Sequence, residues 1–161
     1  MSTAVSLPIC AGELTPHAPP MLLIDEVLSC TDMRVHARAR VRGDGLFFQK
    51  GRGLPSYVGF EIMAQAIAAY DGWVRRAKGE KPTLGFLLGC RRYQTSVDWF
   101  AEGETLEIVA SSLIHEGEMR SFDCKLLTVG GVEVASGTLN VFRPDDPEAF
   151  LAGIGNPVSG A

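Results

Sequence analysis

The chain has 161 residues, the length of a single domain, and its 46% of hydrophobic residues are enough for a core. Its formal net charge of −4 argues against nucleic acid as a partner, because nucleic-acid binding depends on positive charge. No apolar run approaches the length of a membrane span, about 18 residues, and residues 1–16 lack the features of a signal peptide. The 4 cysteines are scattered, which argues against a metal site and a disulfide framework. We therefore expect a cytoplasmic protein with reduced thiols.

The N-terminal part predicts an arm, a turn and two strands. Residues 1–13 are expected to form a flexible arm. Residues 14–20 are a proline-rich turn that carries His17, and residues 21–28 are predicted to form a strand. Residues 34–42 alternate strictly between basic and apolar positions, which is typical of a half-buried strand.

One long helix follows and is the central element of the chain. Residues 57–70 are apolar on every side except at Glu61 and Gln65. A helix that is hydrophobic all round is normally enclosed by protein. Pro55 suits the start of this helix and Gly79 suits its end.

Glu61 is the anomaly of this helix. Burying a carboxylate is costly unless the group is paired or hydrogen-bonded. Gln65 lies four residues later, on the same face, where its amide can hold the carboxyl group. The competing interpretation is that Glu61 caps the helix start or meets solvent there, since acidic residues are common in first turns.

The rest of the chain predicts about four more strands. Residues 83–90 are a short apolar run, interpreted as a central strand, and Gly130 with Gly131 predicts a hairpin. The other three expected strands are residues 105–114, 121–129 and 132–142. We expect residues 144–161 to be a flexible tail, which leaves one domain over residues 14–143. The order of elements predicts an α+β domain with a curved antiparallel sheet wrapped around the helix.

Two segments resemble a known family. Residues 16–25, PHAPPMLLID, resemble the PH-x-x-P-hydrophobic-LLVD segment of hotdog-fold 3-hydroxyacyl-(acyl carrier protein) dehydratases of fatty-acid synthesis. Residues 61–66, EIMAQA, resemble the E-A-M-A-Q-A stretch on that family's central helix. The sequences of residues 58–61 and 84–93 more closely resemble those of a divergent branch, the dehydratases of aryl-polyene-type pigment clusters. The resemblance covers about residues 14–142 and implies a hotdog fold.

The resemblance implies an activity and a catalytic pair. A 3-hydroxyacyl thioester on an acyl carrier protein would lose water, with His17 removing the C2 proton and Glu61 protonating the leaving hydroxyl. No cofactor is needed, because the chemistry is proton transfer alone. The family places two such sites at a dimer interface, each with its histidine from one subunit and its acid from the other. An ordinary loop histidine is the alternative for His17, while His36 and His115 are expected at the surface.

The resemblance also implies a set of substrate contacts. The free N–H groups at the helix start are expected to receive the charge on the thioester carbonyl oxygen. The expected contacts are Ser56, Tyr57, Val58, Gly59, Gln65, Gly85, Phe86 and Leu87. The family's loop before the helix is shortened here and lacks its histidine, and Ser56 replaces a glycine. These departures bear on substrate identity more than on reaction type.

Arginines are the candidate contacts for the carrier protein. Arg91 and Arg92 are expected to meet the carrier or the phosphate of its phosphopantetheine arm. The basic stripe of residues 34–42 is either a solvated sheet face or a rival docking surface. The implied assembly is a homodimer or higher oligomer, or a heterodimer with a paralogous dehydratase. A hotdog acyl thioesterase, which would not need His17, and a non-catalytic partner subunit remain alternative functions.

Overall fold

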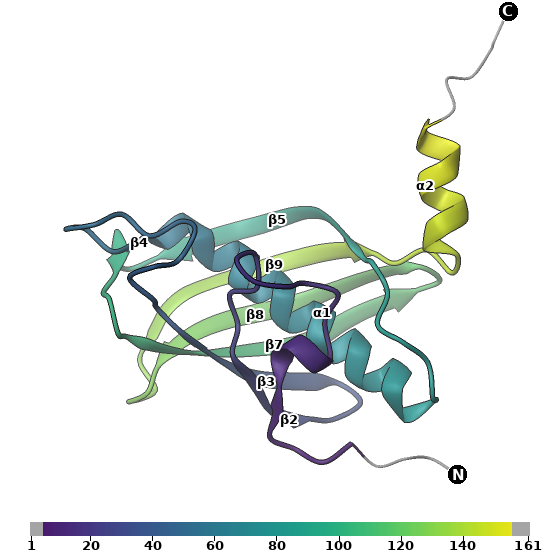
Figure 1. Cartoon of the computed structure of the whole chain (residues 1–161), viewed down its shortest axis with the longest axis horizontal. Coiled ribbons are helices and arrows are strands. Elements are labelled where there is room, and N and C mark those ends of the chain that lie inside the picture. The colour runs from purple at the N-terminus through teal and green to yellow at the C-terminus, as the bar shows by residue number, and fades with distance from the viewer. Residues whose placement is uncertain (1–4, 156–161) are drawn as a thin grey trace, which may run out of the picture.

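The computed structural model describes residues 5–155, and within that range one antiparallel sheet of seven strands carries the fold (Figure 1). The strand order is β1-β2-β3-β7-β8-β9-β5. These strands are β1 (Ile9–Cys10), β2 (Glu26–Cys30), β3 (Arg34–Arg40), β5 (Phe86–Thr95), β7 (Thr105–Glu116), β8 (Met119–Thr128) and β9 (Glu133–Phe142). A small separate ladder pairs β4 (Leu54–Pro55) with β6 (Trp99–Phe100).

The long helix α1 (Gly59–Ala77) lies across the curved sheet, as Figure 1 shows. Ile62, Met63 and Ala66 of α1 belong to the same buried cluster as Ile108 of β7 and Leu126 of β8. Burial of such side chains is the main favourable contribution to folding. The expected arrangement, a sheet wrapped around one buried helix, is therefore confirmed.

The helix ends where the sequence predicts. Gly79 has a φ of +76°, a conformation that glycine adopts without strain. The Gly79 N–H donates to the Arg76 carbonyl oxygen (3.0 Å), and the Glu80 N–H donates to that of Arg75 (2.9 Å). These bonds satisfy carbonyl groups of the last helical turn. At the other end, a 3-10 turn (Ser56–Val58) leads into the helix.

Both ends of the described chain are more structured than the sequence predicts. The expected arm contains β1, and Ala11 is fully buried, with its N–H donating to the Asp25 carbonyl oxygen at 2.9 Å. The expected tail contains a second helix, α2 (Pro147–Gly155). Phe150 of this helix packs against Phe86 and Phe142, with ring centroids 5.3 and 5.2 Å apart. Neither described helix is both long and apolar enough to cross a membrane. The outermost parts of the two expected segments, residues 1–4 and 156–161, lie outside the described residues.

Two predicted strands differ from the observed ones. The first begins at Glu26 rather than at residue 21, because the Leu23 N–H is bonded to a side chain of α1 instead of to a neighbouring strand. Of the apolar run at residues 83–90, residues 86–90 belong to β5, which lies at the edge of the sheet and not in its centre, and residues 83–85 precede it. Its side chains are apolar because Phe86 and Leu87 line a cavity beside α1.

Gln65 fastens the proline-rich turn to α1. Its side chain is fully buried and makes bonds in two directions. Its Oε1 accepts the Leu23 N–H (2.7 Å), and its Nε2 donates to the Met21 carbonyl oxygen (2.7 Å) and to Oε1 of Glu61 (3.1 Å). A buried amide is tolerated because its donors and acceptors are paired. The turn that carries His17 is thereby held against its own chain's helix.

Replacing Gln65 by methionine should weaken the fold. The side chain keeps its length, but the part-buried Leu23 N–H and Met21 carbonyl lose their partner. Met21 is exposed, so water can replace the bond to its carbonyl, and the Leu23 N–H is the group that is left unsatisfied, at about 1–3 kcal/mol. We expect the free energy of unfolding to fall by about 1–3 kcal/mol, measured by urea denaturation at a fixed protein concentration. Gln94→Met, at an exposed position of β5, is the control. Equal stabilities for the two variants would contradict this account.

Candidate active site

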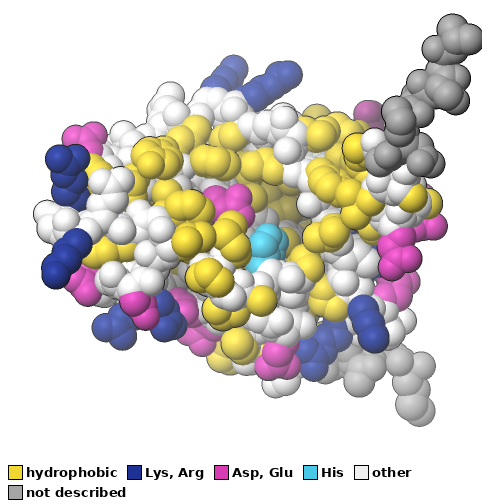
Figure 2. Space-filling view, turned by 45° about the horizontal axis from the view of Figure 1, so that its top comes forward, with side chains coloured by type: hydrophobic (Ala, Val, Ile, Leu, Met, Phe, Trp, Pro, Cys, Tyr) yellow, Lys and Arg dark blue, Asp and Glu magenta, His cyan; other side chains and the backbone are white. Residues whose placement is uncertain are grey.

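A cavity of about 220 Å³ lies between the proline-rich turn, α1 and the end of the sheet that holds β5, β8 and β9. Figure 2 shows a histidine and an acidic side chain surrounded by hydrophobic side chains, next to a hollow in the surface. The cavity walls are Pro16 and His17 of the turn, Glu61, Ala64, Ile67, Ala68, Tyr70 and Asp71 of α1, residues 83–87, and Arg120, Phe122, Val141, Phe142 and Arg143 of the β8–β9 region.

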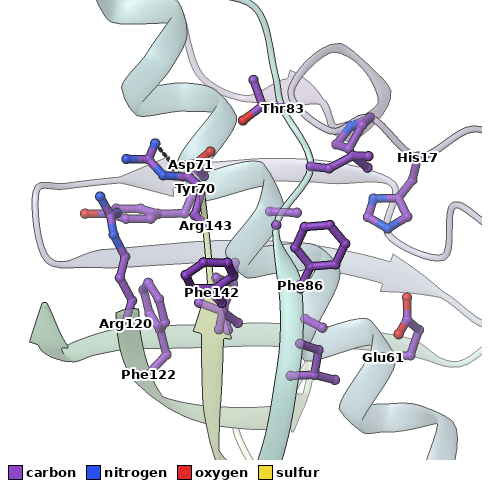
Figure 3. A pocket seen from close by; sticks show the side chains of 18 residues that line it. His17, Glu61, Tyr70, Asp71, Thr83, Phe86, Arg120, Phe122, Phe142 and Arg143 are labelled. Carbon is purple, nitrogen blue, oxygen red and sulfur yellow. Dashed lines mark hydrogen bonds and ion pairs between the residues drawn. The ribbon is translucent and has the colours of Figure 1, made fainter. Parts of the chain in front are cut away.

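His17 and Glu61 meet at one end of this cavity. Figure 3 shows the imidazole and the carboxylate facing one another there. The Nδ1 atom of His17 is buried, and within residues 5–155 it has no hydrogen-bond partner. Oε1 of Glu61 accepts the bond from Gln65, so the predicted contact between these two side chains is confirmed. The cavity end thus holds an imidazole and a carboxyl group, and one oxygen of that carboxyl group is anchored by Gln65.

The two residues reach this cavity from the same chain. The resemblance implies instead that each site combines a histidine of one subunit with an acid of the other. The Gln65 side chain, which bonds to Met21 and Leu23, holds the turn over the helix of its own chain. His17 thereby lines the same cavity as Glu61 of its own chain.

The expected substrate contacts divide into two groups. Gly85, Phe86 and Leu87 line the cavity, and Gln65 stands behind Glu61. The other four expected residues, Ser56, Tyr57, Val58 and Gly59, are not among the residues that line it.

The backbone at the helix start is already partly occupied. The Ser56 N–H donates to the Asp98 carbonyl oxygen (3.0 Å), and the Gly59 N–H donates to the Ser56 carbonyl oxygen. The Tyr93 hydroxyl donates to that same oxygen at 2.5 Å, and burial raises the pKa of Tyr93 to about 12, so it stays a neutral donor. Tyr57 points outward, with 63% of its surface exposed. These contacts give the segment a structural role in seating α1 on the sheet.

The structure adds a polar group that the sequence analysis missed, at the other end of the cavity. Asp71 accepts bonds from Arg143 (2.6 Å) and Arg75 (3.2 Å), and Arg120 lies close by. The position of Asp71 was detectable, because residues 61, 64, 68 and 71 share one helix face. Arg120 and Arg143 come from strands whose register no local pattern gives.

The arginines expected to contact a carrier protein fall into two classes. Arg91 and Arg92 are exposed on the edge strand β5, and neither forms an ion pair with another residue in the described part of the chain. In the basic stripe, by contrast, His36 lies 3.2 Å from Glu107, and Arg38 and Arg42 pair with Glu26 and Asp25. The stripe is thus largely neutralised by its own sheet, which favours the solvated-face interpretation. Over residues 5–155 no group of three or more His, Cys, Asp or Glu side chains is placed to hold a metal ion.

Comparison with known proteins places this geometry in a family. The chain is similar to a solved structure of the dehydratase heterocomplex ApeI:P from Xenorhabdus doucetiae, with 30% identity and a TM-score of 0.83, over 94% of this chain and 100% of that one. More distant similarities include the Escherichia coli PaaI protein from the phenylacetic acid degradation operon (15% identity, TM-score 0.54, 73% and 81% of the two chains). A hypothetical thioesterase protein from Streptococcus pneumoniae TIGR4 is similar at the same level (15%, TM-score 0.55, 73% and 83%). These distant structures share the fold alone.

The hotdog fold implied by the sequence is therefore confirmed. Among curated proteins, none matches the chain. The model of the ApeP-like family, described as ApeP dehydratase, matches residues 9–152, nearly the whole chain. With the fold, the cavity and this match together, we conclude that the chain belongs to the ApeP-like family of dehydratases.

Proposed function

We propose that the protein removes water from a 3-hydroxyacyl thioester carried on an acyl carrier protein and forms the trans-2-enoyl thioester. The observation that carries this proposal is the pairing of His17 with Glu61 at one end of a mainly apolar cavity. The family match supports a role in aryl-polyene-type lipid biosynthesis rather than in general fatty-acid synthesis.

His17 acts as the base. Its ring lines the cavity, and a neutral imidazole has one ring nitrogen with a lone pair that can take the C2 proton of the substrate. The electron pair of that C–H bond becomes the π bond between C2 and C3, and the C3–O bond breaks. The negative charge that develops at C2 is delocalised onto the oxygen of the thioester carbonyl. This delocalisation makes the C2 proton acidic enough to remove.

Glu61 acts as the acid that protonates the departing hydroxyl and releases it as water. Its Oε1 already accepts a hydrogen bond from Gln65, so the proton is held on Oε2. The cavity that Glu61 lines also has Ala64 and Leu87 in its walls, so the acid and the substrate chain share an apolar space. Return of the proton from His17 to Glu61 through solvent closes the cycle.

The edge strand β5 supports assembly with a second hotdog subunit. It is ten residues long, ends the sheet, and exposes 56% of the Leu88 side chain. An uncovered, partly apolar edge is a surface that a second strand pairs with readily. The similar ApeI:P structure is a heterocomplex. We propose a dimer through this edge, with a second copy or a paralogous dehydratase, in the cytoplasm, where the four unpaired cysteines stay reduced.

Removing either member of the pair should abolish most activity. We expect Glu61→Gln and His17→Ala each to lower turnover by about 10²-fold or more, the contribution of a general acid or base. The assay follows the 3-hydroxyacyl carrier protein and its enoyl product by mass spectrometry, and circular dichroism checks the fold. His115→Ala, at an exposed position on β7, is the matched control. Free acid in place of enoyl product would instead indicate a thioesterase, and no product at all a non-catalytic subunit.

Mixing the two inactive variants tests whether the pair comes from one chain. In a mixed dimer each chain still lacks one of the two groups, so we expect activity to stay at the level of the separate variants. If His17 and Glu61 came from different subunits, one site per mixed dimer would be intact. Random exchange makes about half of the dimers mixed, so activity would return to roughly a quarter of wild type. Mass spectrometry of intact dimers confirms that exchange has taken place.

A further inference from the structure

The proposed reaction uses only one end of the cavity, and the other end is also polar. Figure 3 shows Arg120, Asp71 and Tyr70 on one side of the Phe142 and Phe86 rings, with His17 and Glu61 on the other side. All of these residues line the same cavity. An acyl chain whose C2 and C3 atoms lie at the catalytic pair would therefore extend between aromatic rings toward Arg120.

Positive charge exceeds negative charge at this far end. Both oxygens of Asp71 are engaged, Oδ1 by Arg143 at 2.6 Å and Oδ2 by Arg75 at 3.2 Å. Arg75 also pairs with Glu80 at 3.1 Å. Arg120 is the third arginine of the group, and no carboxylate within residues 5–155 forms an ion pair with it. Three guanidinium groups thus face two carboxylates.

Arg120 is held in this position at a cost. Its side chain is half-buried, and burial together with the nearby Arg143 lowers the pKa of Arg120. Tyr70 is close, but its hydroxyl already donates to the Asp32 carbonyl oxygen. A partly desolvated guanidinium retains donors that need an acceptor, since unpaired buried charge is unfavourable.

Thr83 supplies a second, independent sign of a missing partner. It lies in the connection between α1 and β5 and lines the same cavity. Its Oγ1 is buried and, in the described part of the chain, has no hydrogen-bond partner. Buried hydroxyl groups are nearly always paired, so an unpaired one in a cavity wall points to a ligand atom or water.

We propose that Arg120 is a specificity-determining residue, which with Thr83 binds an oxygen group at the far end of the acyl chain. The preferred substrate is then an acyl chain that ends in a hydrogen-bond acceptor, such as a carboxylate or a hydroxyl, and not a plain alkyl chain. The rings of Phe86 and Phe142 between the two ends suit a flat, unsaturated middle section. This inference uses the chain direction set by the proposed function.

The test compares three 3-hydroxyacyl carrier-protein substrates of equal length that end in a methyl, a hydroxyl or a carboxylate group. We expect wild-type kcat/KM to be about 10-fold or more higher for the oxygen-terminated chains, the scale of a hydrogen bond to a charged group. Arg120→Met should remove this preference, because it lowers kcat/KM for the oxygen-terminated substrates more than for the methyl-terminated one. Thr83→Val should reduce the preference without removing a charge. Arg76→Met, at an exposed arginine outside the cavity, is the matched control.

Two outcomes would overturn the inference while leaving the proposed function intact. One is equal wild-type kcat/KM for all three substrates; the other is an equal loss for all three in Arg120→Met, which would mean a structural role. If no substrate is dehydrated, the proposed function fails, and binding decides the inference separately. Methyl esters of fatty acids that carry a terminal hydroxyl or carboxylate should then raise the melting temperature of wild type above that with plain fatty-acid methyl esters, but not that of Arg120→Met. Equal shifts in the two proteins would refute it.

Discussion

The buried amide of Gln65 is the contact on which the site depends. One side chain bonds to the backbone of the proline-rich turn and to the carboxyl group of Glu61. Both N–H groups and the oxygen of the amide are engaged, so the turn, the helix and the acid are fixed relative to one another. A histidine on a surface turn, which would otherwise move with that turn, is thereby placed over a helix that the rest of the sheet encloses.

The helix itself sets the shape of the cavity. Ala64 and Ala68 separate Glu61 from Asp71 along one face, and their small side chains leave space where leucines would fill it. The two polar ends of the cavity are therefore separated by an apolar section of the helix surface. One end carries groups that can give and take protons, and the other carries cations. The same element that forms the core thus also determines the length of the cavity.

The parts of the fold that depend on local patterns were predictable. The apolar helix, its end at Gly79, and the hairpin at Gly130–Gly131 follow from periodicity and backbone preference, and all three are present. The Glu61–Gln65 contact was also predictable, since four residues along a helix define neighbours. The packing of α2 was not, because Phe150 is ordered by rings that lie far away in the sequence.

The site itself was predictable only in part. His17 and Glu61 were found through motifs, but their meeting within one chain depends on a side-chain-to-backbone contact that no sequence pattern encodes. Arg120 and Arg143 enter the cavity through the register of β8 and β9. The edge position of β5 was missed because a strand that lines a cavity is as apolar as a central strand.

A histidine and an acid on the same chain have a consequence for the evolution of assemblies. When a dimer shares its catalytic groups across the interface, both subunits must retain them, and a duplicated gene cannot diverge without damaging its partner's sites. A self-sufficient subunit is free of this constraint. In the dimer that we propose, a partner needs only to match the edge of β5, so a paralogue that changes or loses its own chemistry would still join the complex. Mixed assemblies of unequal subunits are then accessible by gradual steps.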